Sequence, residues 1–191
     1  MFINFLAIML INLTAGLFLL AYYVFRGLDD PNQRQWAPGF AIVGIIGLAT
    51  GLDMIFTWPL PSSFNISFGE MTVLFGALYL GAALALGLGW NLMSVAVYAF
   101  FAGIAAIIVG IRLINLHLTQ EPALAGAGFI IAGLTGVLLG PVLYLKENQA
   151  ARTIFVIIAI IAFLIFAFIG YEAYWGHIAD YLKGVPATLK K

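Results

Sequence analysis

The sequence contains no cysteine and few charged residues. Its 191 residues include 8 Lys and Arg, 8 Asp and Glu and 2 His, and the formal net charge is zero. Without cysteine, disulfides, thiolate metal sites and thiol nucleophiles are excluded. The balanced charge gives no reason to expect nucleic acid as a partner. Charged residues make up only 8% of the chain, against about 25% in soluble proteins, so they are too few to cover a soluble core.

Apolar residues make up 64% of the sequence, which also has 21 glycines. A helix of about 20 apolar residues crosses the hydrocarbon core of a bilayer, and the sequence contains six such runs. We therefore predict an all-α integral membrane protein with six transmembrane helices. The predicted single transmembrane domain covers 1–191, with approximate spans 2–25, 38–57, 70–89, 91–114, 123–145 and 153–174 and a short polar tail at 175–191.

Tryptophans and basic residues support these limits and suggest an orientation. All four tryptophans (Trp36, Trp58, Trp90 and Trp175) lie at predicted helix ends, where an amphipathic ring prefers the headgroup region. An even number of spans puts both chain ends on one side, here called the terminal side. Bases close to helix ends are more numerous on the opposite side (Arg26, Arg34, Lys146 and Arg152) than on the terminal side (Arg112 and Lys183). By the positive-inside rule, we predict a multi-pass protein of the cell membrane with both termini outside.

Acidic residues and both histidines collect on the terminal side. This group consists of Asp53, Glu70, Glu121, Glu172, Asp180, His117 and His177. On the opposite side, Asp29, Asp30 and Glu147 are intermixed with bases, which we interpret as an ordinary solvated surface. The distribution predicts that a polar site, if there is one, lies on the terminal side.

Each acidic candidate also has a structural interpretation. Asp53 lies about one turn inside the second span, where a carboxylate is costly unless it is paired, hydrated or protonated. Ser67 and Glu70 match the S-x-x-E capping box at the start of the third span. Glu121 precedes a proline at the start of the fifth span, where the helix dipole favours an anion. Glu172 lies near the predicted end of the sixth span, where the dipole disfavours an anion, so we expect it to have a partner.

The histidines leave several chemistries open. A cluster of His117, His177 and Glu121 could bind a metal ion, relay protons or sense pH, and haem between the two histidines is a further alternative. The E-x-x-H and H-E-x-x-H spacings are absent, so the cofactor stays unknown. Serine hydrolase, phosphate-loop and dinucleotide motifs are also absent, which favours a role other than catalysis.

Two glycine-rich runs suggest an internal duplication. GFAIVGIIGLATG (39–51) and GFIIAGLTGVLLG (128–140) match at four glycines, one phenylalanine and one isoleucine. Each run lies in the middle span of a three-helix half, and an odd number of spans per half would put the halves in opposite orientations. This pattern predicts a 3+3 inverted repeat. The same glycines permit close helix packing, so we expect the second and fifth spans at the centre of the bundle.

One segment carries a family resemblance. It contains Thr57-Trp58-Pro59-Leu60-Pro61, then Asn65-Ile66 and Phe68-Gly69-Glu70, and it follows a glycine-rich helix that ends with Asp53. The combination resembles an uncharacterised family of small multi-spanning membrane proteins of bacteria and archaea, a domain of unknown function. The resemblance implies that Asp53, Trp58, Pro59, Pro61, Asn65 and Glu70 belong to the signature of the family. It implies no activity or cofactor.

Three functional hypotheses follow. The first is a small transporter or channel-like protein for a cation, a proton or a small solute, with Asp53, Trp58, Asn65, Glu70 and Glu172 as binding residues. The second is a metal- or haem-binding membrane subunit of a redox assembly, and the third is an accessory or scaffolding subunit. The expected partner is the lipid bilayer. Further copies of the chain or a larger membrane complex remain alternatives.

Overall fold

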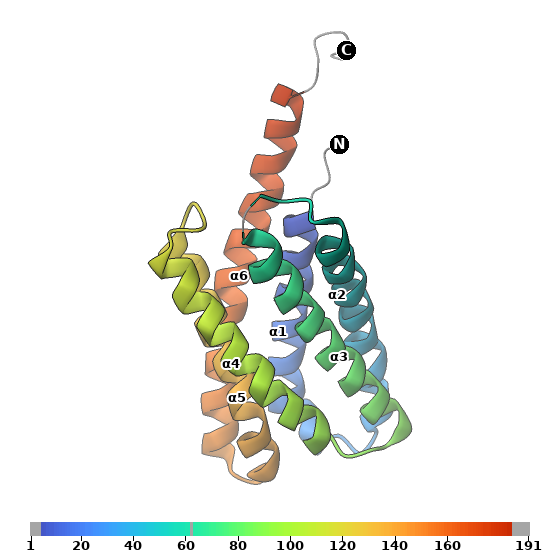
Figure 1. Cartoon of the computed structure of the whole chain (residues 1–191). Helices are drawn as coiled ribbons and strands as arrows, with labels where there is room; N and C mark the ends of the chain where they lie inside the picture. Colours follow the sequence, from blue (N-terminus) through green and yellow to red (C-terminus); the bar gives the residue numbers. More distant parts are fainter. Residues whose placement is uncertain (1–4, 62, 185–191) are drawn as a thin grey trace.

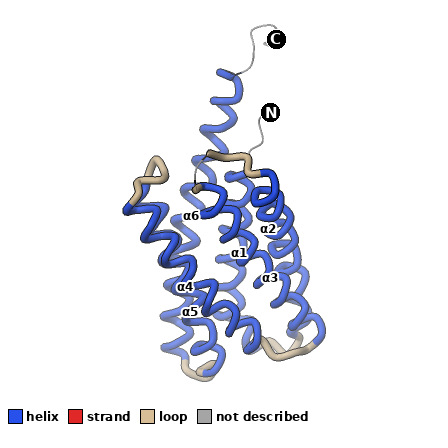
Figure 2. Tube along the Cα trace, viewed as in Figure 1, coloured by secondary structure: helices blue, strands red, loops and turns tan. Residues whose placement is uncertain are grey.

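The computed structural model describes residues 5–61 and 63–184. In these ranges the chain forms six long helices and no strand (Figures 1 and 2). The helices are α1 (Phe5–Arg26), α2 (Ala37–Thr57), α3 (Met71–Leu88), α4 (Met93–Asn115), α5 (Pro122–Tyr144) and α6 (Gln149–Gly184). Two 3-10 helices, η1 (Gly27–Asp29) and η2 (Gln33–Trp36), connect α1 to α2, and a π-helical turn, η3 (Asn65–Glu70), leads into α3.

The prediction of six spans is confirmed. All six helices are long and apolar enough to cross a membrane, and a helix satisfies its backbone hydrogen bonds internally, as the hydrocarbon core requires. Outward-facing side chains such as Ile45, Phe101 and Ile157 are more than half exposed, which suits contact with lipid. The start of α1, the end of α6 and the α2–α3 and α4–α5 connections lie on the same side of the bundle, the terminal side (Figure 1).

Local sequence explains where several helices begin and end. Proline lies in the first turn of α2 and of α5, where its missing N–H is not needed. Gly89 ends α3 in the left-handed region at φ 75°, which glycine adopts without a steric penalty. Trp58 ends α2 in the same region at φ 47°, a conformation that is uncommon for a bulky residue.

The predicted capping box at Ser67 and Glu70 is wrong. The chain is already helical from Phe64, and neither η3 nor α3 has a side-chain cap at its start. Ser67 is buried within the turn, and its amide donates to the carbonyl of Ser63 at 2.9 Å. Asn65 holds the preceding loop instead, because its side chain accepts from the amide of Leu60 at 3.1 Å and donates to the carbonyl of the same residue.

The last helix is longer than expected. α6 runs to Gly184, ten residues beyond the predicted end of the sixth span at 174, into the segment expected to be a polar tail. The prediction followed the end of the apolar run. A helix can continue beyond that point because its backbone hydrogen bonds do not depend on apolar side chains.

The helices pack mainly in pairs. α1 packs on α6, α2 on α3 and α4 on α5, whereas α3 and α4 touch each other only sparsely. α1 is the most buried span, with half of its membrane-spanning window inside the bundle, and it lies in the middle of Figure 1. The expectation that the second and fifth spans are central is therefore wrong.

Glycine does bring helices close together, as predicted. A methyl group added at Gly44 of α2 would lie 2.5 Å from the amide nitrogen of Leu80 in α3. One added at Gly133 of α5 would lie 2.5 Å from the carbonyl oxygen of Gly103 in α4. The glycine face of α2 thus meets the following helix, and that of α5 meets the preceding helix. The halves do not repeat this contact, so the inverted repeat stays a hypothesis that the packing does not support.

The side opposite the termini is more than an ordinary solvated surface. Arg152, near the start of α6, is 3% exposed. Its guanidinium donates to the carbonyls of Val24 and Phe25 at 3.0 and 2.8 Å and to the carboxylate of Asp29 at 2.7 and 3.0 Å. The last carbonyls of a helix have no partner within the helix. Arg152 therefore closes the end of α1 and ties it to α6.

Candidate functional site

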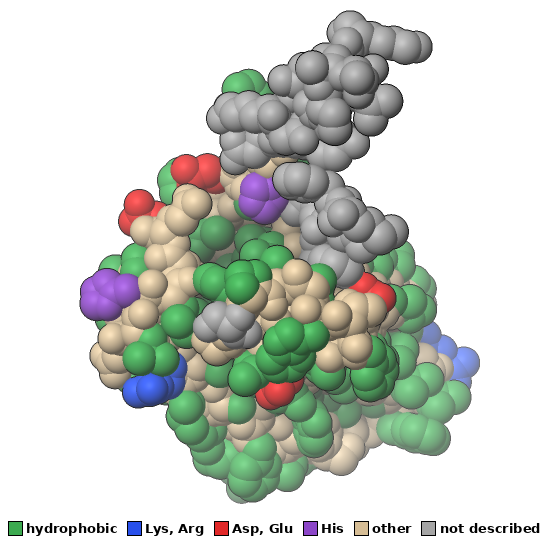
Figure 3. Space-filling model, turned by 45° about the horizontal axis from the view of Figure 1, so that its top comes forward, with side chains coloured by type: hydrophobic (Ala, Val, Ile, Leu, Met, Phe, Trp, Pro, Cys, Tyr) green, Lys and Arg blue, Asp and Glu red, His purple; other side chains and the backbone are tan. Residues whose placement is uncertain are grey.

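A hollow of about 660 Å³ lies on the terminal side, and we call it the vestibule. Its walls come from the start of α1, from η3, from the α4–α5 loop, from the start of α5 and from the end of α6. Its polar lining residues are Thr119, Gln120, Glu121, Glu172 and His177. Figure 3 brings this side of the molecule forward and shows acidic and histidine side chains among apolar ones. The floor is apolar and includes several phenylalanines.

Three of the predicted site residues lie in the wall of the vestibule. Glu121, Glu172 and His177 all line it, although they come from the start of α5 and the end of α6. The described lining includes no lysine or arginine, so two carboxylates dominate its electrostatic potential. The prediction that Glu172 has a partner assumed that the sixth span ends near this residue. Since α6 continues to Gly184, Glu172 lies inside the helix and the dipole argument does not apply.

Other predicted site residues lie elsewhere. Asp53, Glu70 and Trp58 are exposed and do not line the vestibule. Asn65 is fully buried and holds the loop at Leu60. A common binding site for these residues and Glu172 therefore remains a prediction without geometric support.

The arrangement of possible metal ligands is loose. His117 is exposed in the turn after α4, with φ at 50°, and it does not line the vestibule with Glu121 and His177. Over the described part of the chain, no three side chains of the His, Asp or Glu type are close enough together to hold a metal ion. The predicted metal set of His117, His177 and Glu121 is therefore not assembled in this structure.

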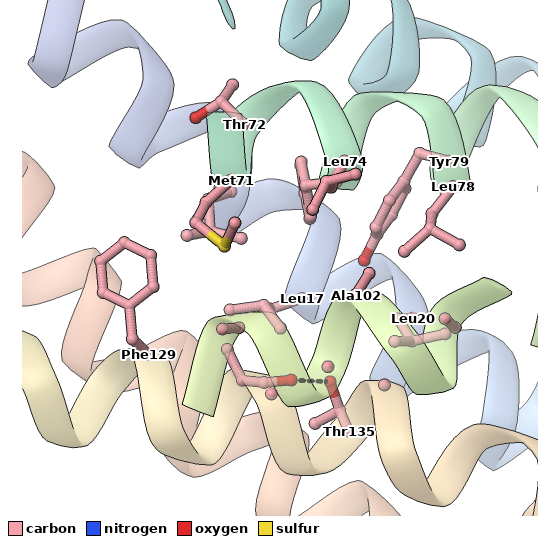
Figure 4. A pocket seen from close by; sticks show the side chains of 18 of the residues that line it. Leu17, Leu20, Met71, Thr72, Leu74, Leu78, Tyr79, Ala102, Phe129 and Thr135 are labelled. Atoms are coloured by element: carbon pink, nitrogen blue, oxygen red, sulfur yellow. Dashed lines mark hydrogen bonds between the residues drawn. The ribbon is translucent and has the colours of Figure 1, made fainter. Parts of the chain in front are cut away.

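A second hollow, of about 140 Å³, lies inside the bundle, and we call it the central cavity. All six long helices contribute to its lining, which is almost wholly apolar (Figure 4). Thr72, Tyr79 and Thr135 supply its polar groups. The hydroxyl of Thr135 donates to the carbonyl of Ala132 at 2.6 Å, whereas the hydroxyl of Tyr79 is buried and has no hydrogen-bond partner among the described residues. Sequence reasoning missed this cavity, and a tyrosine inside an apolar span was its one signal.

The two hollows share a wall. Phe68, Phe129 and Phe166, together with Leu10, line both of them. The ring centroids of Phe68 and Phe129 are 5.6 Å apart, and those of Phe129 and Phe166 are 5.5 Å apart, with interplanar angles of 69° and 85°. This edge-to-face geometry is the favourable one for aromatic pairs. The three rings, here called the phenylalanine layer, separate the vestibule from the central cavity.

Fold and site together define the class: a six-span helical membrane protein with an acidic vestibule on one side. The chain belongs to a family described as protein of unknown function (DUF981), which matches residues 1–180. This match confirms the resemblance to an uncharacterised family. No curated protein and no solved structure shows significant similarity to the chain. Function must therefore be argued from the two hollows.

Proposed function

We propose that this protein is a small transporter or channel-like protein that moves a small organic solute, with one cationic end and an apolar body. The observation that carries the proposal is the succession of the acidic vestibule, the phenylalanine layer and the central cavity. With both termini outside, as the distribution of bases suggests, the vestibule opens to the exterior of the cell. The solute then enters at the carboxylates and continues towards the middle of the bilayer.

The charge of the vestibule supports a cationic group. Glu121 and Glu172 line the hollow, whose described lining contains no lysine or arginine, and a concave surface with one sign of charge concentrates ions of the opposite sign. The next region favours an apolar body. An inorganic ion at the phenylalanine layer would lose its hydration shell without gaining oxygen ligands, which is costly. An organic solute can bury carbon against the same walls.

The phenylalanine layer supplies a gate in this proposal. Its rings contact each other through edges and faces, and no hydrogen bond has to break when such a ring changes rotamer. Hydrophobic constrictions close pores by excluding water. The arrangement described here is the closed one, because the vestibule and the central cavity are separate hollows.

Uptake of benzyltrimethylammonium into liposomes that contain the purified protein tests the proposal. This probe has a permanent charge and an apolar ring, and it crosses lipid slowly. We expect uptake above that of protein-free liposomes, with a half-saturation concentration that rises roughly fivefold or more in Glu172→Gln, since a nearby charge contributes about 1 kcal/mol or more. Glu147→Gln is the matched control, because Glu147 is exposed in the α5–α6 connection on the opposite side. Equal uptake with and without protein, or equal effects of the two variants, would rule out the proposal.

Opening the phenylalanine layer is expected to raise uptake. Phe129→Ala removes the ring that contacts both Phe68 and Phe166 and joins the vestibule to the central cavity, so a severalfold increase in the initial uptake rate should follow. Phe155→Ala is the control. Phe155 is completely buried in α6 and lines neither hollow, so this variant loses a similar amount of packing without joining the two. If both variants change the rate alike, the layer is not a gate.

A further inference from the structure

We infer that the central cavity is a binding site for a compact, neutral, apolar molecule that carries one hydrogen-bond acceptor, and that the hydroxyl of Tyr79 donates to this acceptor. The inference goes beyond the proposed function, because a ligand can occupy the cavity whether or not the protein moves it across the membrane. It rests on the cavity, on the unpartnered hydroxyl and on the way the tyrosine ring is held.

Tyr79 presents an unused hydrogen-bonding group to the cavity. The residue is 6% exposed, and its oxygen has no hydrogen-bond partner in the part of the chain that the structure describes. Figure 4 shows the ring extending from α3 into the cavity, and the end of the ring that carries the hydroxyl lies near Gly16 of α1. Buried polar groups are nearly always hydrogen-bonded, because an unmade bond costs free energy. An acceptor on a bound molecule would satisfy this hydroxyl.

The tyrosine ring is fixed between two other rings. Its centroid is 4.3 Å from that of Phe75 and 5.5 Å from that of Phe40. These contacts hold the direction of the hydroxyl before any ligand arrives, and such preorganisation lowers the entropic cost of binding. The neighbouring hydroxyl of Thr135 is already bonded to the carbonyl of Ala132. Of these two hydroxyls, that of Tyr79 is therefore the one available to orient a ligand.

The rest of the lining sets the ligand's chemistry. The described lining of the central cavity contains no lysine, arginine, aspartate, glutamate or histidine. A charged solute that passes through would therefore find no counter-ion to retain it, and a ligand that stays bound there is neutral. The cavity volume of about 140 Å³ is on the order of that of an apolar protein cavity that takes up a single benzene ring. A six-membered ring with one carbonyl or ether oxygen fits this description.

Two probes of nearly the same shape isolate the hydrogen bond. Acetophenone and ethylbenzene differ in one position, a carbonyl in the first and a methylene in the second. Their dissociation constants are obtained from the ligand dependence of the thermal unfolding midpoint, measured on the full chain in lipid nanodiscs for the parent and for Tyr79→Phe. We expect acetophenone to bind the parent about three- to tenfold more tightly than it binds the variant, as one neutral hydrogen bond provides. Ethylbenzene should bind both proteins alike.

The thermal unfolding midpoints of the ligand-free proteins give a further test. Tyr79→Phe removes a buried hydroxyl without a partner, so its midpoint in the absence of probe should equal or exceed that of the parent. A second variant, Ala102→Leu, fills part of the central cavity with a larger side chain and should abolish the midpoint shift with both probes. The inference is overturned if neither probe shifts the parent, or if the advantage of acetophenone persists in Tyr79→Phe. No flux is measured, so this result stands apart from the uptake experiment.

Discussion

Replacing Arg152 with methionine is expected to lower the free energy of unfolding by about 2 to 5 kcal/mol. The main cause is the loss of donors to the carbonyls of Val24, where the bond is buried, and of Phe25, where it is partly buried, because a buried carbonyl left without a partner costs about 1 to 3 kcal/mol. The ion pair contributes less, since the side chain of Asp29 is 66% exposed and exposed pairs contribute little. Reversible unfolding of the protein in mixed micelles, monitored by circular dichroism, gives the measurement.

Two further variants separate these contributions. Asp29→Asn removes the ion pair and keeps the carbonyl contacts, so its effect should stay below about 1 kcal/mol. Arg34→Met removes a base from an exposed position on the same side of the membrane and controls for the change in charge distribution. If Asp29→Asn destabilises the protein as much as Arg152→Met, the stabilisation comes from the ion pair and the carbonyl argument is wrong.

Replacing Gly133 with alanine is expected to destabilise the protein by about 1 to 3 kcal/mol, the usual range for overpacking. The added methyl group would lie 2.5 Å from the carbonyl oxygen of Gly103. Backbone atoms cannot rotate away as a side chain can, so α4 and α5 must separate. The same unfolding measurement applies.

The control for this substitution is a glycine of α3 that has more space. Among the described residues, a methyl group at Gly81 would meet nothing closer than a methyl carbon of Val95, at 3.7 Å. Gly81→Ala should therefore be neutral or stabilising by up to about 1 kcal/mol, through the higher helix propensity of alanine. Equal destabilisation by the two substitutions would show that the close contact between Gly103 and Gly133 does not hold α4 against α5.

The number of spans was predictable from the sequence because the bilayer imposes a minimum length on apolar helices. The helix ends were less predictable, since a helix can continue after its apolar run stops. Because α6 is longer than predicted, Glu172 lies in the interior of the helix and not at its end. The reason to expect a partner for Glu172 no longer applies. The sequence also indicated that Glu121 and His177 share a side with Glu172, and the vestibule brings all three together.

Other features depend on contacts between distant parts of the chain. Arg152 binds carbonyls more than 120 residues earlier, and sequence alone shows only a base near a helix end. The sequence contains 21 glycines, and only the packing shows that Gly103 contacts Gly133. The environment of Tyr79 depends on all the helices that surround the central cavity. Local patterns carry no information on such neighbours.

The pairing of helices has a mechanical consequence. The closest contacts of a glycine with the backbone of another helix lie inside each half of the bundle, between α2 and α3 and between α4 and α5, so we expect each half to be stiff. α1 and α6 join the two halves through an extensive contact, whereas α3 of one half and α4 of the other touch only sparsely. Arg152 fixes the contact between α1 and α6 at the end far from the vestibule. We therefore expect a rocking motion of the two halves to be least restrained at the vestibule and between α3 and α4.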